Sequence, residues 1–175
     1  YVVKPYNDGS SVHVFIVKEG QEHPPQGILR TDWDGDEDLM VERFIPGREL
    51  TCAVMGDVAL GVIEIMTDLA FYNYEAKYVN GGSQHELPAQ VSPKIYEKVQ
   101  KMSLMAHAAL GCRGVTRSDF RYDPRGGDDG ELVCLEINTQ PGMTKTSLVP
   151  ELAAHAGHSF EELVSWMVEA AQCDA

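Results

Sequence analysis

The residues best suited to chemistry lie on a short strand-like segment, residues 132–138, where oxygen-bearing side chains alternate with apolar ones. Because successive side chains of a strand point to opposite faces, Glu136 and Asn138 share one face. The other face, which we expect to enter a core, consists of Val133, Leu135 and Ile137. This strand is therefore predicted to present a carboxylate and an amide on its polar face.

A second acidic residue precedes that strand. Residues 123–130 are rich in Pro, Gly and Asp, which predicts a loop between two neighbouring antiparallel strands. This loop folds Asp119 back towards Glu136. Asp119, Glu136 and Asn138 then offer hard oxygen ligands from a rigid sheet, a set that suits Mg²⁺ when it also binds substrate phosphates. Arg117 is on the same strand face as Asp119, where its guanidinium can meet an anion held by the metal.

The same alternation is also typical of a sheet face that only contacts water, so these residues alone leave two interpretations open. Their continuation favours the metal site. Residues 136–148 read E-I-N-T-Q-P-G-M-T-K-T-S-L, and this run resembles the end of the ATP site in D-alanine:D-alanine ligases of the ATP-grasp superfamily. Three further segments, residues 4–12, 39–49 and 71–78, fit the same family in the same order.

Composition and charge narrow the classes of function. The 175 residues are 43% hydrophobic and 23% charged, which is ordinary for a globular protein able to bury a core. A formal net charge of -13 argues against a nucleic-acid partner, because phosphate backbones are bound by clustered Lys and Arg. No apolar run approaches the roughly 20 residues of a membrane helix, and we expect no signal peptide before the fold. We therefore expect no nucleic acid and no membrane as partners.

The cysteines indicate no metal or redox motif. Cys52, Cys112, Cys134 and Cys173 form no C-x-x-C pair, so we expect reduced thiols in a cytoplasmic protein. The chain begins at Tyr1 within a strand-like run and without a Met, and we expect it to be a fragment of something longer.

Hydrophobic patterning predicts several strands. Short strands are expected over residues 1–4 and 12–16, separated by turn-forming residues. Residues 39–45 form a dense apolar run, which predicts a buried strand. Residues 51–55 and 59–65 are typical of a hairpin that turns at Gly56-Asp57.

Three helices are also expected. Ser92 caps the first, which Gly111 ends, and its apolar face consists of Ile95, Val99, Met102, Ala106 and Leu110. Pro150 opens a short helix. Ser159 and Glu162 form a capping box for a last amphipathic helix, whose apolar face consists of Leu163, Val164, Met167, Val168 and Ala171.

The resemblance assigns phosphate contacts to the beginning of the chain. In this family the lysine of a K-P-x-x-x-G-S-S-V segment contacts the α and β phosphates of ATP, which implies that role for Lys4. The resemblance also places Ser10 in a hydrogen-bond network of the active site. His13 stands where the family usually has glycine, so the close backbone approach of this loop to phosphate is in question.

The remaining nucleotide contacts come from two further segments. The resemblance implies an adenine pocket lined by Glu42, Arg43 and Ile45. It implies that Glu49, of the P-G-R-E segment, binds the ribose hydroxyls. Residues 71–78, F-Y-N-Y-E-A-K-Y, are similar to the family's mobile lid, which implies that Lys77 contacts the γ-phosphate and that Tyr78 helps to select the second substrate.

The resemblance also supplies residues for bond formation. It implies that Arg117 and the N–H group of Gly142 hold the oxyanion of a tetrahedral intermediate. Ser147 and Leu148 are implied to bind the carboxylate of the acceptor.

An activity follows from these roles. The resemblance implies an ATP-dependent, ADP-forming ligase that joins two D-alanine molecules through an acyl phosphate, with two Mg²⁺ or Mn²⁺ ions as cofactors. The product would enter peptidoglycan synthesis in the cytoplasm, and so cell wall biogenesis and cell shape. The family's N-terminal domain is missing from these residues, so we expect the chain alone to be inactive and the full-length enzyme to be a homodimer.

The implied fold is ATP-grasp, of the α+β class, with mixed or antiparallel sheets, flanking helices and a truncated N-terminus. Residues 1–44 would be part of the smaller central lobe and residues 45–175 the C-terminal lobe. Two alternatives remain open: another ATP-grasp carboxylate-amine or D-alanine:D-lactate ligase, and a non-catalytic nucleotide-binding module. The pair Lys77-Tyr78 favours a dipeptide product.

Overall fold

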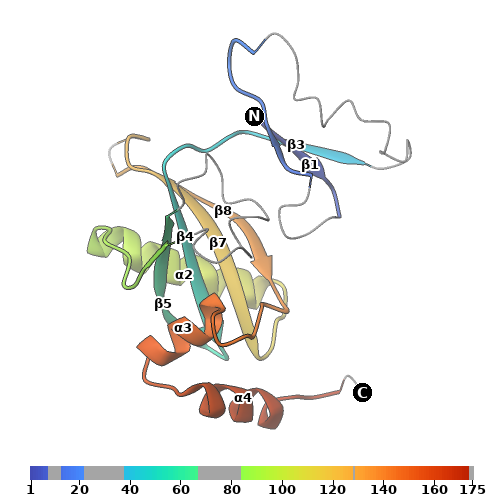
Figure 1. The fold of residues 1–175 in the computed structure, drawn as a ribbon, viewed down its shortest axis with the longest axis vertical. Coiled ribbons are helices and arrows are strands. Elements are labelled where there is room, and N and C mark those ends of the chain that lie inside the picture. Colours follow the sequence, from blue (N-terminus) through green and yellow to red (C-terminus); the bar gives the residue numbers. More distant parts are fainter. Residues whose placement is uncertain (8–12, 22–37, 67–83, 128, 174–175) are drawn as a thin grey trace. The chain divides into compact units, whose positions relative to one another are not determined.

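A computed structural model describes residues 1–7, 13–21, 38–66, 84–127 and 129–173. The chain divides into two compact units. The first contains the described residues up to Ile45, and the second contains Pro46–Met66 and the described residues from His85 onward (Figure 1). Across these described parts, no helix has both the length and the apolar content needed to cross a membrane.

The first unit contains a three-stranded antiparallel sheet in the order β2-β1-β3. Its strands are β1 (Val2–Pro5), β2 (Phe15–Ile16) and β3 (Leu39–Glu42). The predicted first strand is confirmed, but β2 is shorter than the expected 12–16. β3 ends at Glu42, and Val41 is 64% exposed, so the prediction of a buried strand over 39–45 is wrong. Its side chains alternate in exposure because β3 pairs with β1 alone in the described sheet.

The second unit is built on a five-stranded sheet in the order β6-β5-β4-β7-β8. Its strands are β4 (Arg48–Met55), β5 (Val58–Met66), β6 (Gln84–Glu86), β7 (Val115–Asp123) and β8 (Glu131–Asn138). β4 is antiparallel to both β5 and β7, and β7 is antiparallel to β8. The hairpin at Gly56-Asp57 and the loop after Asp123 are therefore confirmed. The two predicted hairpins join β4 to β5 and β7 to β8, and the pairing of β4 with β7 then places β4, β7 and β8 side by side.

Three helices complete this unit, namely α2 (Pro93–Ala109), α3 (Leu148–His155) and α4 (Phe160–Glu169). α2 covers one face of the sheet and α3 lies against β5 and β4 on the other, while α4 contacts α3 (Figure 1). The Ser92 cap on α2 and the capping box of Ser159 with Glu162 are confirmed. α3 begins at Leu148, two residues before the predicted Pro150.

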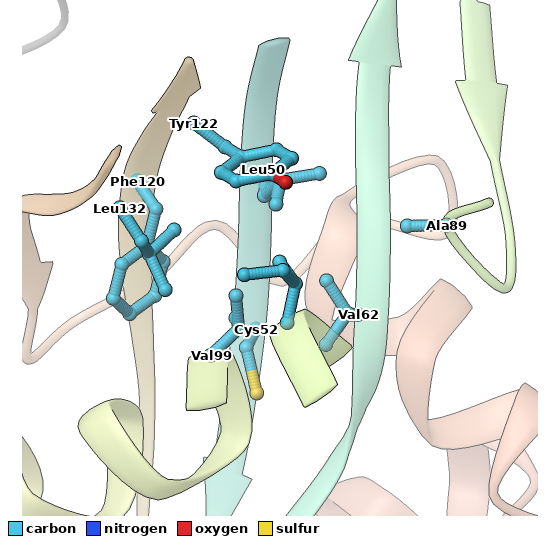
Figure 2. Close-up of a cluster of buried hydrophobic side chains, with 9 residues drawn as sticks. Leu50, Cys52, Val62, Ala89, Val99, Phe120, Tyr122 and Leu132 are labelled. Carbon is cyan, nitrogen blue, oxygen red and sulfur yellow. The ribbon is translucent and has the colours of Figure 1, made fainter. Parts of the chain in front are cut away.

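A core of apolar side chains joins the sheet to α2. Figure 2 shows this cluster, which consists of Leu50, Cys52, Val62, Ala89, Ile95, Val99, Phe120, Tyr122 and Leu132. Leu50 and Cys52 point into it because they alternate along β4 with Thr51, which faces away. Burial raises the pKa of the Cys52 thiol to about 11, so this thiol stays protonated at neutral pH.

The buried side of α2 differs from the predicted apolar face. The helix buries Ile95, Val99, Ser103 and His107, whereas Leu110 is 62% exposed. The two polar residues are tolerated there because each has a hydrogen-bond partner. Ser103 Oγ donates to the carbonyl of Val99 at 3.0 Å, and His107 Nδ1 lies 2.9 Å from Thr116 Oγ1. The buried stripe of α2, with residues spaced by four, is thus continued by two hydrogen-bonded polar side chains.

The last helix also departs from its predicted face. Only Leu163 is buried among the described residues of α4, while Val168 is 70% exposed and Ala171 lies beyond the end of the helix. The physical reason is that, among the described elements, α4 packs chiefly against α3, with Trp166 beside the turn at Gly56, so a narrow stripe of its surface is covered.

A bulge in β8 corrects the predicted apolar face of that strand. Asp119 pairs with Glu136 but Phe120 pairs with Cys134, so Leu135 is an extra residue without a partner. Strict alternation therefore fails at this point. Before the bulge Leu132 and Cys134 pack against α2, whereas Leu135 is 37% exposed. The prediction that Val133, Leu135 and Ile137 form one core face is therefore wrong. Val133 precedes the bulge and Ile137 follows it, so the two side chains point to opposite faces, and neither is fully buried.

The turn into β4 gives a testable prediction. Gly47 has φ +94°, and a Cβ placed there would lie 2.2 Å from the carbonyl oxygen of Tyr122. Gly127 has φ +72° but open space around the same position. We expect Gly127→Ala to cost roughly 1 kcal/mol, from backbone strain alone. Gly47→Ala should cost about 3 kcal/mol or more, because backbone atoms of β7 must move.

Urea unfolding of both variants gives their free energies of unfolding. The difference between the two losses is the cost of the steric clash at residue 47, because both variants carry backbone strain. Equal losses of unfolding free energy for the two variants would contradict the close approach of Gly47 to β7.

Candidate functional site

The three predicted metal ligands lie together on one face of the sheet. Asp119 is directly opposite Glu136, and Arg117 is directly opposite Asn138. Asn138 Nδ2 donates to Asp119 Oδ2 at 3.1 Å and to Glu136 Oε1 at 3.4 Å. The bulge at Leu135 is the cause, since it turns Glu136 and Asn138 away from the face that carries Leu132.

The carboxylate of Asp119 is the centre of this cluster. It is buried, at 8% exposed, and Arg117 binds it with two hydrogen bonds, from Nε to Oδ1 at 2.9 Å and from Nη2 to Oδ2 at 2.8 Å. Thr51 Oγ1 donates to Oδ1 at 2.6 Å. Together with Asn138, these donors give each carboxylate oxygen two partners. A buried negative charge is stable here because it is paired and fully hydrogen-bonded.

The donor set fits a hard divalent cation. Among the described residues no three His, Cys, Asp or Glu side chains are grouped for a metal ion, so the candidate site consists of two carboxylates and the amide of Asn138. Mg²⁺ takes one or two carboxylates together with phosphate and water. Asp119 already accepts two hydrogen bonds on each oxygen, so metal binding requires one donor to leave. Rotation of the Asn138 amide would release Asp119 Oδ2 and present Asn138 Oδ1 in place of Nδ2.

A second ion pair lies further along the same face. Glu49 is directly opposite Arg121, with 3.4 Å between Glu49 Oε2 and Arg121 Nη1. Arg121 Nη2 also donates to the carbonyl of Gly47 at 2.8 Å. The predicted ribose ligand is therefore held by a cation that the sequence analysis did not single out.

A turn before α3 brings three of the predicted substrate residues together. A Cβ at Gly142 would lie 3.2 Å from Ser147 Oγ. That hydroxyl accepts the N–H of Thr144 at 3.0 Å and lies 2.8 Å from Thr144 Oγ1. Leu148 begins α3 and its side chain is buried. Ser147 and Gly142 thus present polar groups at this turn, whereas Leu148 can contribute its backbone.

The predicted residues of the first unit lie on and after its sheet. Lys4 Nζ is 2.6 Å from Glu42 Oε2, which joins β1 to β3. Ile45 is buried and Arg43 is exposed. His13 has φ +55°, so it adopts the left-handed conformation that glycine would allow at this position. Ser10, Lys77 and Tyr78 lie outside the described residues.

Thr51 and Arg121 are the residues that sequence reasoning missed. Thr51 interrupts an apolar strand, and the only signal was its hydroxyl between Leu50 and Cys52. Arg121 is two residues from Asp119, and the period of a strand places both on one face. Neither signal identifies a partner until the register of β4 against β7 is known.

Comparison with known proteins shows the family of this chain. A family model described as "D-ala D-ala ligase C-terminus" matches residues 1–169. D-alanine–D-alanine ligase B of Mesorhizobium japonicum is 66% identical over 174 residues, which cover 99% of this chain and 56% of that protein. The chain belongs to the D-ala D-ala ligase C-terminus family. It spans about half the length of the curated relatives it matches.

Two solved structures have the same fold. The Bacillus anthracis D-alanine–D-alanine ligase complexed with ATP matches 97% of this chain and 51% of its own chain, with a TM-score of 0.72 and 28% identity. The VanG D-Ala:D-Ser ligase from Enterococcus faecalis matches 97% of this chain and 48% of its own, with a TM-score of 0.76 and 30% identity. The predicted α+β ATP-grasp fold is confirmed.

The contact between Thr51 and Asp119 gives a second prediction. Thr51→Val removes one donor from the carboxylate while keeping the shape of the side chain. We expect the affinity for Mn²⁺, measured by isothermal titration calorimetry, to fall roughly tenfold. The matched control is Thr116→Val, which removes an equally buried hydroxyl from the opposite face of the sheet.

Both variants should lose about 1 kcal/mol of unfolding free energy, since each deletes one buried hydrogen bond. Only Thr51→Val should alter the metal affinity. If both variants bound Mn²⁺ as the unaltered protein does, Asp119 would not be positioned by Thr51 for a metal.

Proposed function

We propose that this chain is the ATP- and Mg²⁺-binding part of an ATP-dependent, ADP-forming D-alanine:D-alanine ligase. The observation that carries the proposal is the cluster of Arg117, Asp119, Glu136 and Asn138 on one sheet face. Family membership supports the choice of reaction. The product is a dipeptide for peptidoglycan synthesis in the cytoplasm, and through it for cell wall biogenesis and cell shape.

The reaction has two steps. The carboxylate of one D-alanine attacks the γ-phosphate of ATP, and ADP leaves. The amine of a second D-alanine then attacks the acyl phosphate, the new amide bond forms, and inorganic phosphate leaves with the loss of a proton from the amine. Asp119, Glu136 and Asn138 would hold two Mg²⁺ or Mn²⁺ ions, which would supply charge neutralisation for the transferred phosphoryl group.

We assign the nucleotide contacts residue by residue. Lys4 and Lys77 bind its phosphates, and Ser10 takes part in the surrounding hydrogen-bond network. Glu49 binds the ribose hydroxyls. The adenine pocket is formed by Glu42, Arg43 and Ile45. The burial of Ile45 and the ion pair of Glu42 with Lys4 support an adenine contact made by side chains that are held in place.

The acceptor and the intermediate are held near α3. Arg117 and the N–H of Gly142 stabilise the oxyanion, and Arg117 can do so because two hydrogen bonds to Asp119 fix its orientation. Ser147 and the backbone of Leu148 bind the carboxylate of the second D-alanine. The proximity of Gly142 to Ser147 supports placing these two functions at one turn. Tyr78 selects the second substrate.

The proposal includes an organisation for the complete enzyme. Residues 1–44 belong to a smaller central ATP-grasp lobe and residues 45–175 to the C-terminal lobe; a division of contacts one residue later, between Ile45 and Pro46, supports a boundary at this point. A first-substrate domain acts together with them, the complete enzyme is a homodimer, and this chain alone does not ligate D-alanine.

Substitution of one metal ligand tests the proposed function. In the complete enzyme we expect Glu136→Gln to lower kcat for D-alanine-dependent ADP release by about 100-fold or more, because a charged metal ligand becomes neutral. The melting temperature should stay within about 1 °C of the unaltered enzyme, since Glu136 is exposed. The matched control, Glu97→Gln, makes the same change on the exposed side of α2.

Mass spectrometry of the dipeptide, with D-alanine, D-lactate and D-serine offered together, identifies the product. Parallel losses of melting temperature and rate in Glu136→Gln would favour a structural role for this residue and count against the metal site.

A further inference from the structure

Arg121 shares the sheet face of Arg117 and Asp119, but it is not among the residues proposed to bind the metal, the nucleotide or the substrate. It is paired with Glu49 across β4 and β7, with Nη1 3.4 Å from Glu49 Oε2. Its Nη2 donates to the carbonyl of Gly47 at 2.8 Å. The side chains of Arg121 and Glu49 are only 17% and 14% exposed. One guanidinium thus holds two points of the segment that leads into β4.

The opposite face of this segment is also fixed. Arg48, between Gly47 and Glu49, donates from Nε to Glu64 Oε1 at 2.7 Å and from Nη1 to the carbonyl of Gln90 at 3.0 Å. The position of the backbone at Glu49 is therefore set from two sides. What Arg121 adds is the direction of the Glu49 carboxylate.

The charge of Arg121 matters because Glu49 is mostly buried. A carboxylate with little exposure needs a cation or several donors to remain ionised and in one orientation. A carboxylate has about four lone-pair sites, so pairing with Arg121 is compatible with accepting two vicinal hydroxyl groups. A planar guanidinium can bind Glu49 and the Gly47 carbonyl together, which a single ammonium group does less well.

We propose that Arg121 is a positioning residue for nucleotide recognition: by holding Glu49 and the Gly47 carbonyl, it presents the Glu49 carboxylate to the ribose hydroxyls. This inference rests on the proposed function, because it takes the ligand of Glu49 to be the ribose of ATP. Arg121 then sets the affinity for ATP and the preference for ribose over 2′-deoxyribose. It leaves the affinity for D-alanine and the rate of the chemical step unchanged.

The test uses the complete enzyme with Arg121→Met, which keeps an unbranched aliphatic stem and removes the guanidinium with its charge and donors. We expect KM for ATP to rise roughly tenfold, with kcat and KM for D-alanine changed less than about twofold. The ratio of KM for 2′-deoxy-ATP to KM for ATP should fall towards the ratio of Glu49→Gln. The double variant should be no worse than Glu49→Gln alone, because both changes remove one interaction.

Two further variants separate positioning from stability. Arg121→Lys should raise KM for ATP by an intermediate amount, about threefold, because the lysine ammonium can replace only part of the guanidinium's contacts with Glu49 and Gly47. Arg125→Met removes another cation shortly after the same strand, one that pairs with Asp123 and not with Glu49, and should leave every nucleotide constant unchanged. A merely structural role would lower the melting temperature of Arg121→Met without changing the preference for ribose.

The outcomes distinguish this inference from the proposed function. An unaltered KM for ATP and an unaltered ribose preference in both Arg121 variants would overturn the inference while leaving the ligase activity in place. If the enzyme released no ADP with D-alanine, isothermal titration with ATP and 2′-deoxy-ATP would still measure the role of Arg121. Absence of any nucleotide binding would overturn both.

Discussion

The neutralisation of one buried carboxylate, that of Asp119, is the interaction on which the rest of this sheet face depends. Removing a charge from water is costly unless donors or an opposite charge replace the lost hydration. Here Arg117, Thr51 and Asn138 do so, and each comes from a different position of β7, β4 or β8. The order of these three strands is therefore what makes the site possible, because β4, β7 and β8 each supply one donor to the same carboxylate. A bound cation would have to replace one of those donors. Asn138 can be the one replaced, because rotation of its amide ends the hydrogen bond to Asp119 and keeps the side chain in the cluster.

The bulge in β8 resolves a conflict that a regular strand could not. Leu132 must face α2 to complete the core, while Glu136 lies four residues later and would share that face under strict alternation. One extra residue, Leu135, reverses the alternation between them. The same short strand can then close an apolar core at one end and carry polar ligands at the other, at the cost of one partly exposed leucine. Bulges commonly direct side chains in this way beside functional sites.

Much of this architecture can be predicted from local sequence, and the features that could not be predicted have a common cause. The turn at Gly56-Asp57 and the cap at Ser92 depend on neighbouring residues, and both were predicted. The extra residue in β8, the burial of His107 and the partners of Arg121 depend on the register between strands or on packing of a helix against the sheet. No local signal marks Leu135 as extra, because Gly and Pro are absent around it. The roles of Ser10, Lys77 and Tyr78 stay predictions, since these residues lie outside the described parts of the chain.

Anomalous diffraction from crystals of the complete enzyme, grown with Mn²⁺ and a non-hydrolysable ATP analogue, locates the metal directly. We expect an anomalous peak bound by carboxylate oxygens of Asp119 and Glu136. We also expect the Asn138 amide to be turned, with Oδ1 towards the ion, and Arg117 and Thr51 still to bind Asp119. An anomalous peak away from Asp119 and Glu136, or an Asn138 amide that still donates to Asp119 beside a bound ion, would contradict this placement of the metal.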